Sequence, residues 1–264
     1  MGREILSLAA PPADLRIPYG DQPSQFIDFR YPPSPATGCT VVMVHGGFWR
    51  AAYDLLHAGH FCAALTAAGM VTANVEYRRV GEAGGGWPST LEDVSAAVEF
   101  VRNHRGRRGR TLVAGHSAGG HLALWLAAEH QDLAGVVALA PVACLQTAWN
   151  QGLGSGAVAG FLGGPPAEVP ERYALACPSQ RPAVPPRTLI HGTADGIVPL
   201  SQSREYVQAR AGDPGGVRLL ELPGADHFDV IDPRSAAWPA VLDAIRSAAS
   251  ASTLDHPNQS PNCV

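Results

Sequence analysis

A serine between small residues is the first candidate for chemistry in this sequence. Residues 115–119 read Gly-His-Ser-Ala-Gly, with an apolar strand-like run before them (111–115) and an apolar helix-like run after them (120–128). In that setting the pattern G-x-S-x-G is typical of a nucleophile elbow, a strained turn that exposes the serine hydroxyl. Small neighbours favour such a turn, because a larger side chain would clash there. We therefore predict that Ser117 is a nucleophile.

A serine hydroxyl is a poor nucleophile near neutral pH, so it needs a base and a carboxylate that orients the base. The strand-like run 186–191 leads into a loop that holds Asp195, and the strand-like run 217–222 leads into one that holds His227. The order Ser, Asp, His, with each partner in a loop just after a strand, is a known order for such a triad. We predict that Asp195 and His227 are the partners of Ser117.

Three nearby side chains compete for these two roles. Asp226 and Asp229 are too close to His227 in sequence to come from the neighbouring strand end, and His191 lies within or at the end of its own strand. The simpler alternative is that Asp195 is a turn residue and His227 a surface histidine. The order and setting of all the features together favour the triad.

A glycine-rich loop upstream is suited to binding the oxyanion of an acyl-transfer reaction. The buried-strand run 41–44 ends in His-Gly-Gly-Phe-Trp at 45–49. Such an anion needs backbone N–H donors, and glycines let the backbone approach it closely. We predict an oxyanion hole formed by this loop and by the amide after the nucleophile: Gly46, Gly47, Phe48 and Ala118. The alternative is a glycine-rich turn with no chemistry.

Four segments of the chain together resemble the α/β-hydrolases: 45–49, 115–120, 192–199 and 224–228. The form H-G-G-x-W looks like the kynurenine formamidase and related esterase branch. The stretch Glu-Tyr-Arg-Arg at 76–79, Trp-Pro at 87–88 and Asp93 are similar to small bacterial members of that branch. Relatives of the hormone-sensitive-lipase type usually carry a third glycine where this chain has Phe48. The resemblance spans roughly residues 20–248 and implies the fold and mechanism more specifically than the substrate, because carboxylesterases share the loop.

The basic residues exclude several other kinds of catalysis. All 19 are arginine, which removes Schiff-base enzymes, the phosphate-loop lysine and the Ser-x-x-Lys hydrolases. The net charge is −4 and the pI is about 6.2, so there is no general electrostatic reason to bind nucleic acid or an acidic membrane. A cluster of arginines between a helix and the next strand is interpreted as a solvated loop: Arg102, Arg105, Arg107, Arg108 and Arg110.

No metal site and no cofactor is predicted. His57 and His60 lack an H-E-x-x-H pattern or a third ligand, and the glycines at 152, 154 and 156 miss the spacing of a dinucleotide loop. His116 and His121 are expected to pack or hydrogen-bond locally. The cysteines are odd in number, scattered and without C-x-x-C, so reduced thiols are expected rather than disulfides. They are Cys39, Cys62, Cys144, Cys177 and Cys263.

Strand-like and helix-like runs alternate, which predicts an α/β fold with a doubly wound, mostly parallel sheet and a site at the carboxyl ends of its strands. The expected strands are 25–31, 41–44, 70–76, 111–115, 133–140, 186–191 and 217–222, and the expected helices are 52–68, 91–103, 120–129, 202–211 and 236–249. One α/β-hydrolase domain is predicted over 1–250, with a Gly- and Pro-rich cap at 141–183 and a disordered tail at 251–264. The alternative for 141–183 is a long surface excursion.

Aromatic side chains are predicted to ring the substrate pocket: Phe48, Trp49, Trp87, Trp149 and Phe228. Aromatic walls favour a small aryl or planar group, so the residues support hydrolysis of a small carboxylic ester or an activated amide. The resemblance adds N-formylkynurenine as a candidate substrate. The alternatives are a peptidase and a non-catalytic relative that uses the pocket as a ligand receptor.

The expected partner is a small-molecule ester or amide, with no nucleic acid and no membrane, and a homodimer is left open. Residues 1–20 contain no apolar run long enough for a signal peptide, and no other segment is long and apolar enough for a membrane helix. A cytoplasmic location is therefore expected.

Overall fold

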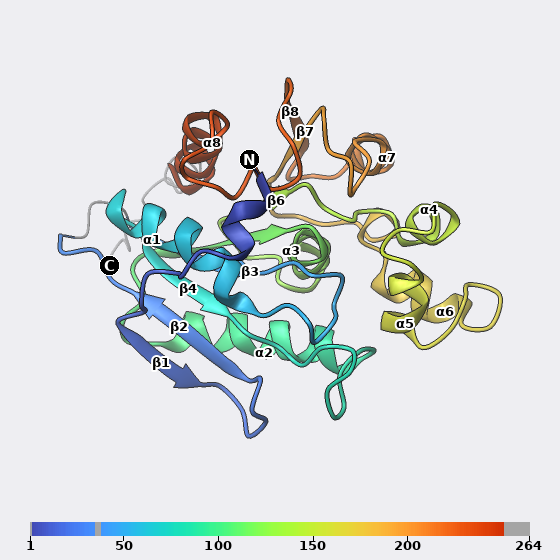
Figure 1. The fold of residues 1–264 in the computed structure, drawn as a ribbon, viewed down its shortest axis with the longest axis horizontal. Helices are drawn as coiled ribbons and strands as arrows, with labels where there is room; N and C mark the ends of the chain where they lie inside the picture. Colours follow the sequence, from blue (N-terminus) through green and yellow to red (C-terminus); the bar gives the residue numbers. More distant parts are fainter. Residues whose placement is uncertain (1, 35–37, 251–264) are drawn as a thin grey trace, which may run out of the picture.

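Apolar runs that are covered on both faces form the centre of a mostly parallel sheet. The computed structural model describes residues 2–34 and 38–250, and its eight-stranded sheet has the order β1-β2-β4-β3-β5-β6-β7-β8 (Figure 1). β2 pairs antiparallel with β1 and with β4, whereas the later pairings are parallel. The strands are β1 Leu15–Pro18, β2 Phe26–Arg30, β3 Cys39–Val44, β4 Val71–Val75, β5 Arg110–His116, β6 Gly135–Leu139, β7 Arg187–Gly192 and β8 Val217–Leu222.

Helices cover both faces of the sheet, as the predicted doubly wound fold requires (Figure 1). Alternation along β3 divides its side chains between two cores. Val42 and Val44 belong to the core of α2 and α3, whereas Val41 and Met43 belong to the core of α1 and α8. The helical elements are η1 Gly2–Leu6, η2 Leu55–Ala58, α1 Gly59–Ala67, α2 Ser89–Asn103, α3 Ala118–Glu129, α4 Leu145–Asn150, α5 Ala157–Leu162, α6 Pro170–Ala176, η3 Pro178–Gln180, α7 Ser201–Arg210 and α8 Trp238–Ser250.

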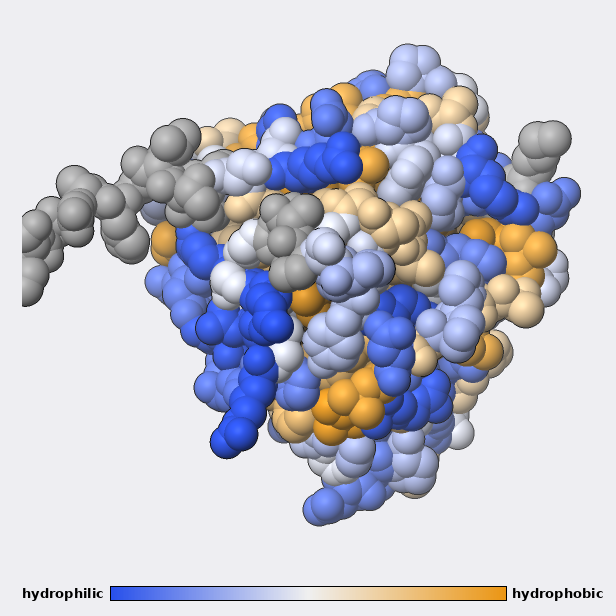
Figure 2. All heavy atoms as spheres, turned by 90° about the vertical axis from the view of Figure 1, so that its left-hand side faces the viewer, coloured by the Kyte–Doolittle hydropathy of each residue, from blue (hydrophilic) through white to orange (hydrophobic). Residues whose placement is uncertain are grey.

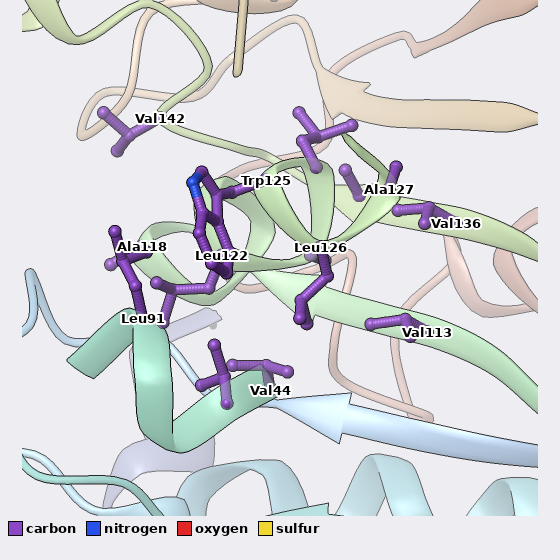
Figure 3. Packing of buried hydrophobic residues seen from close by; sticks show 14 of the residues in the cluster. Val44, Leu91, Val113, Ala118, Leu122, Trp125, Leu126, Ala127, Val136 and Val142 are labelled. Carbon is purple, nitrogen blue, oxygen red and sulfur yellow. The ribbon is translucent and has the colours of Figure 1, made fainter. Parts of the chain in front are cut away.

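The helix α3 is buried along most of its length, because it lies between the sheet, α2 and the cap. Figure 3 shows Leu122 and Leu126 of this helix packed toward Val44 of β3 and Val113 of β5. The apolar character of α3 on all sides follows from this central position. The helix is therefore held firmly against the strand that precedes it, and so is the turn that joins the two.

Two elements differ from the predictions. The expected helix 52–68 is divided, because Asp54 accepts a hydrogen bond from the Leu56 amide and caps the 3-10 turn η2, so that α1 begins only at Gly59. The edge strand β1 has no counterpart among the predicted strands. It is short and mostly exposed, and an ion pair of 2.6 Å between Arg16 and Asp28 joins it to β2.

The predicted cap region 141–183 contains three short helices and a 3-10 turn rather than an open excursion. Phe161, Leu162 and Tyr173 of these helices are buried in the same core as α3. In Figure 1 the helices α4, α5 and α6 form a separate group at the right-hand end of the molecule. The predicted tail 251–264 lies outside the described residues.

Candidate active site

Ser117 occupies the sharp turn between β5 and α3. Its backbone has φ 57° and ψ −117°, and L side chains rarely adopt a positive φ. Neighbouring backbone holds the turn, because the Ser117 amide donates to the Leu139 carbonyl at 2.8 Å and the Val142 amide donates to the Ser117 carbonyl at 3.2 Å. The end of β6 and the loop after it therefore fix a strained turn of the kind that the sequence predicts.

Close backbone contacts explain the small residues around this serine. A Cβ on Gly119 would lie 2.1 Å from the Val44 carbonyl oxygen, and one on Gly46 would lie 3.1 Å from the Ser117 Cβ. Glycine at 46 therefore lets the predicted oxyanion loop lie directly against Ser117. The Ala118 amide has no acceptor within α3, since Ala118 is the first residue of that helix.

The loops after β7 and β8 bring the predicted carboxylate and base together. His227 Nδ1 lies 2.7 Å from Asp195 Oδ2, and both side chains are buried. Asp195 Oδ1 accepts hydrogen bonds from the Ile197 and Val198 amides, each at 2.8 Å. The carboxylate thus engages one ring nitrogen of His227, which leaves Nε2 for a reacting group. His227 and Ser117 line the same cavity.

His191, a rival base in the sequence, supports Asp195 instead. Its Nε2 lies 2.9 Å from the Val198 carbonyl, so this nitrogen carries a proton, and it also lies 3.2 Å from Asp195 Oδ2. Its Nδ1 lies 2.7 Å from the Ser203 hydroxyl. Burial would raise the pKa of Asp195, but hydrogen bonds from His191 and His227 outweigh burial and lower that pKa. The carboxylate therefore stays charged at neutral pH.

His116 links the nucleophile turn to the loop that carries His227. Its Nε2 donates to the backbone carbonyl of His227 at 2.9 Å, and the two ring centroids are 4.6 Å apart. Burial, together with the neighbouring His227, lowers the pKa of His116 well below its usual range, so the ring is neutral. The local role expected for His116 is thus a hydrogen bond from the end of β5 to the loop after β8.

A buried network holds the His-Gly-Gly loop. His45 Nδ1 donates to the Gly46 carbonyl at 2.8 Å, and its Nε2 lies 2.9 Å from Glu76 Oε1. The Tyr77 hydroxyl donates to the His45 carbonyl at 2.9 Å. Burial would raise the pKa of Glu76, but attraction to His45 and Arg79 outweighs burial and lowers it. The Glu-Tyr-Arg-Arg stretch therefore positions the predicted oxyanion loop.

Consecutive residues of this loop point in different directions, because φ is positive at three of them: 112° at Gly47, 51° at Phe48 and 57° at Trp49. Phe48 lines the cavity beside Ser117, whereas Trp49 is fully buried. Arg50 then donates to the Gly154 carbonyl at 2.5 Å and joins the loop to the cap.

The candidate site opens into a cavity of about 290 Å³. Its walls are Leu6, Gly47, Phe48, Tyr53, His57, His116, Ser117, Ile197, His227 and Phe228. Of the aromatic residues predicted for the pocket, Phe48 and Phe228 line this cavity, whereas the three tryptophans lie elsewhere. Trp49 stacks on Phe161 in the core with ring centroids 4.7 Å apart, and Trp87 packs against the same core. Trp149 is an exposed residue of α4 and is not a wall residue.

Five wall residues are not among the predicted site residues: Leu6, Tyr53, His57, His116 and Ile197. Ile197 lies in the loop of Asp195, His116 precedes Ser117, and the other two except Leu6 follow the predicted oxyanion loop. Nearness in sequence to a predicted site residue is therefore a signal that could have found these four. Leu6 carries no such signal. Burial, together with nearby His45, lowers the pKa of His57 to about 3, so the His57 ring in the cavity wall is neutral at neutral pH.

Asp226 and the described cysteines have structural surroundings rather than a place in the cavity wall. Asp226 Oδ1 accepts hydrogen bonds from the Phe228 amide at 2.8 Å and the Asp229 amide at 3.0 Å, so it shapes the loop that carries His227. The four described cysteines are buried and free, and Cys263 lies outside the described residues. Burial raises the pKa of Cys39 to about 11 and that of Cys62 to about 12, which keeps both thiols protonated.

Within residues 2–34 and 38–250, no group of His, Cys, Asp and Glu side chains is arranged to hold a metal ion. No helix in the same residues has both the length and the apolar character to cross a membrane. The face in Figure 2 mixes polar residues with separate apolar patches, without a continuous apolar belt.

Comparison with known proteins identifies a family and a relative. Residues 27–209 match the family model BD-FAE. The chain is 30% identical over 254 residues to a protein named Esterase LipC from Mycobacterium tuberculosis, in a match that covers 82% of this chain. The chain spans 60% of the length of that relative.

Solved structures share the fold. A truncated carbohydrate esterase from gut microbiota has a TM-score of 0.78 at 20% identity, over 90% of this chain and 99% of that one. Esterase B from Lactobacillus rhamnosis has a TM-score of 0.79 at 21% identity, over 95% of this chain and 90% of that one. At these identities the likeness shows the fold alone, which is the predicted α/β-hydrolase fold.

Proposed function

This chain belongs to the BD-FAE family, and on that premise we propose that it is a serine hydrolase that cleaves small carboxylic esters. One observation carries the proposal: a strained serine and a histidine line one cavity, and a buried carboxylate binds the other nitrogen of that histidine. These are Ser117, His227 and Asp195. The similarity to LipC, a relative named as an esterase, supports an ester as the bond that is cleaved.

In the proposed reaction, Ser117 Oγ attacks the ester carbonyl while His227 Nε2 takes the hydroxyl proton. Asp195 holds the proton on Nδ1 and stabilises the imidazolium that forms. His227 then gives its proton to the leaving alkoxide, which departs as the alcohol and leaves an acyl-enzyme. A water molecule, activated by His227 in the same way, releases the acid and returns Ser117.

The oxyanion is proposed to accept hydrogen bonds from the Ala118 amide and from the amide of Gly47 or Phe48. Because Phe48 follows directly on the loop glycines and lines the cavity, its ring favours a small acyl group. Each methylene that does not fit would cost about 1–3 kcal/mol, or roughly 10- to 200-fold in kcat/KM. We expect acetate to be the best of the p-nitrophenyl esters from acetate to decanoate. A maximum at octanoate or longer would contradict the small acyl site.

The decisive experiment measures p-nitrophenyl acetate, N-formylkynurenine and an aminoacyl arylamide side by side. We expect wild-type protein to hydrolyse the acetate, and a fluorophosphonate probe to label Ser117. Faster turnover of N-formylkynurenine than of every ester would identify the aryl formamidase that the resemblance implies. Release of the amino acid from the arylamide would identify a peptidase. Absence of both turnover and labelling would identify a non-catalytic ligand-binding relative.

The cellular setting stays a prediction. We propose a cytoplasmic location and a small-molecule partner without nucleic acid or membrane, and the homodimer stays open. Size-exclusion chromatography with light scattering measures the oligomeric state directly, and cell fractionation measures the location.

A further inference from the structure

The N-terminal segment forms one wall of the cavity. Leu6, the last residue of η1, lines the cavity together with Ser117, although the two residues are far apart in the sequence. In Figure 1 this segment, in dark blue, runs from the N-terminal label past α1. It precedes residue 27, where the family match begins, so that match carries no information about this wall.

Several contacts fix the segment in place. Ile5 is fully buried in the core of α1 and α8, so the side chain next to Leu6 acts as an anchor. The Ser7 amide donates to the Glu4 carbonyl at 3.0 Å and closes the turn. Further along, Arg30 donates to the Pro11 carbonyl at 2.7 Å. The N-terminal segment that carries Leu6 is therefore an integral part of the fold.

Tyr53 forms another part of the cavity mouth. It packs against Gly47 of the oxyanion loop, where an added Cβ would lie 2.4 Å from the Tyr53 Cβ. The turns η1 and η2 contact each other, so Leu6 and the segment beside Tyr53 are neighbours. We call Leu6 and Tyr53 the ledge. Their exposed fractions are 39% and 44%, against 3% for Ser117, so an apolar surface continues from the buried centre to the solvent.

The chemistry of these walls selects a kind of ligand. In the part of the chain that the structure describes, no Asp, Glu or Arg side chain lines the cavity, so a charged group would find no opposite charge there. Exposed apolar side chains gain free energy when a ligand covers them, about 25 cal/mol per Å² of apolar surface buried. The ledge therefore suits a neutral, apolar arm.

We propose that the ledge binds the alcohol arm of the ester and that Leu6 is a specificity-determining residue for alkyl or aryl alcohols. This inference rests on the proposed esterase function. Because a small acyl group is expected beside Phe48, the longer part of the substrate is its alcohol group. The preferred substrate is thus a short-chain acid esterified to an apolar alcohol.

The test uses ethyl, butyl and hexyl acetate, because these alcohols have similar leaving-group chemistry and differ in apolar length. Acid release by the wild-type protein should give a kcat/KM that rises from ethyl to hexyl acetate. In Leu6→Ala the hexyl-to-ethyl ratio should fall about three- to tenfold, mainly through KM, since the apolar contact is lost. Leu6 is partly exposed, so folding should not change, and thermal melting checks this.

Leu8→Ala is the matched control. Leu8 is 38% exposed, close to the 39% of Leu6, but it is not a wall residue. The hexyl-to-ethyl ratio of kcat/KM in Leu8→Ala should match that of the wild type. In Leu6→Ala, the ratio of kcat/KM for ethyl acetate to that for ethyl hexanoate should stay unchanged, because these two substrates differ only in the acyl group. An unchanged hexyl-to-ethyl ratio in Leu6→Ala, or an equal fall in Leu8→Ala, overturns the ledge. If Leu6→Ala changes only the ratio for ethyl acetate and ethyl hexanoate, the ledge does not bind the alcohol group. Failure of folded wild-type protein to hydrolyse any ester instead overturns the proposed function.

Discussion

The buried centre of the site and its exposed rim are built in different ways. In the centre, Asp195 and His227 are held by hydrogen bonds of 2.7–2.8 Å, and His191 adds a further contact at 3.2 Å. At the rim, Leu6 and Tyr53 are held by packing and are partly open to solvent. The centre therefore tolerates little change, whereas the rim can change its side chains without unfolding the protein.

The largest expected effect is at the centre. Ser117→Ala removes the proposed nucleophile, and we expect turnover to fall by roughly four to six orders of magnitude, as triad deletions do in other enzymes. The melting temperature should stay close to that of the wild type, because one hydroxyl is lost from a turn that is held through its backbone. A folded variant with a tenth of the wild-type activity would end the assignment of Ser117.

The carboxylate should come next. Asp195→Asn preserves the shape of the side chain but favours the wrong imidazole tautomer of His227, so kcat should fall about ten-thousandfold. Asp226→Asn is the matched control, since the Asp226 carboxylate accepts hydrogen bonds only from amides of its own loop in the described structure. If the loss appeared in Asp226→Asn and not in Asp195→Asn, the carboxylate would be wrongly assigned.

A smaller effect should come from the cap, through its contact with Phe48. A Cβ on Gly154 would lie 2.6 Å from the Phe48 ring, whereas one on Gly152 would meet nothing within 4 Å, although both glycines have similar positive φ. Gly154→Ala should therefore move Phe48 and lower kcat/KM for p-nitrophenyl acetate about tenfold. Gly152→Ala carries the same backbone strain without that contact. Equal losses in both variants would mean that strain, rather than Phe48, is the cause.

The smallest effect is on stability and comes from a buried histidine beneath the cap. Burial lowers the pKa of His121 to about 4, against about 6.5 in an unfolded chain. The unfolded state therefore takes up the proton first, so the stabilisation is complete above pH 6.5 and is lost as the pH falls toward 4. His121→Gln should flatten the pH dependence of the unfolding free energy by up to about 1.4 kcal/mol per pH unit in that range. Urea unfolding from pH 7 to 4 measures it, and an unchanged slope would contradict a neutral buried ring.

The same contrast explains what the sequence could predict. The elbow at Ser117 and the loops of Asp195 and His227 follow from local patterns, since each residue lies in the turn or loop after a strand and parallel strands bring their ends together. Trp49 lies away from the cavity although it follows Phe48 directly, because nearness in sequence does not fix side-chain direction. Positive φ at two successive residues turns Phe48 into the cavity and Trp49 into the core.

Long-range packing accounts for the rest. Leu6 reaches the cavity because Ile5 enters the core of α1 and α8, and no periodic pattern near residue 6 announces that contact. The strand β1 was missed for a related reason: it is short and mostly exposed, and it is joined to β2 by the ion pair of Arg16 with Asp28. Local patterns therefore predict the positions of Ser117, Asp195 and His227 better than they predict the outer walls of the cavity.

The hydrogen bond from His116 to the His227 carbonyl has a consequence for engineering. The motif G-x-S-x-G allows any residue at position 116. In this protein, however, the imidazole of His116 hydrogen-bonds to the loop that carries His227. A randomised library at 116 would therefore return few active clones, although the motif suggests free choice. Diversity is better introduced at Leu6, whose partly exposed side chain lines the cavity. In this protein, the fixed letters of the motif therefore omit a position whose side chain joins two parts of the site.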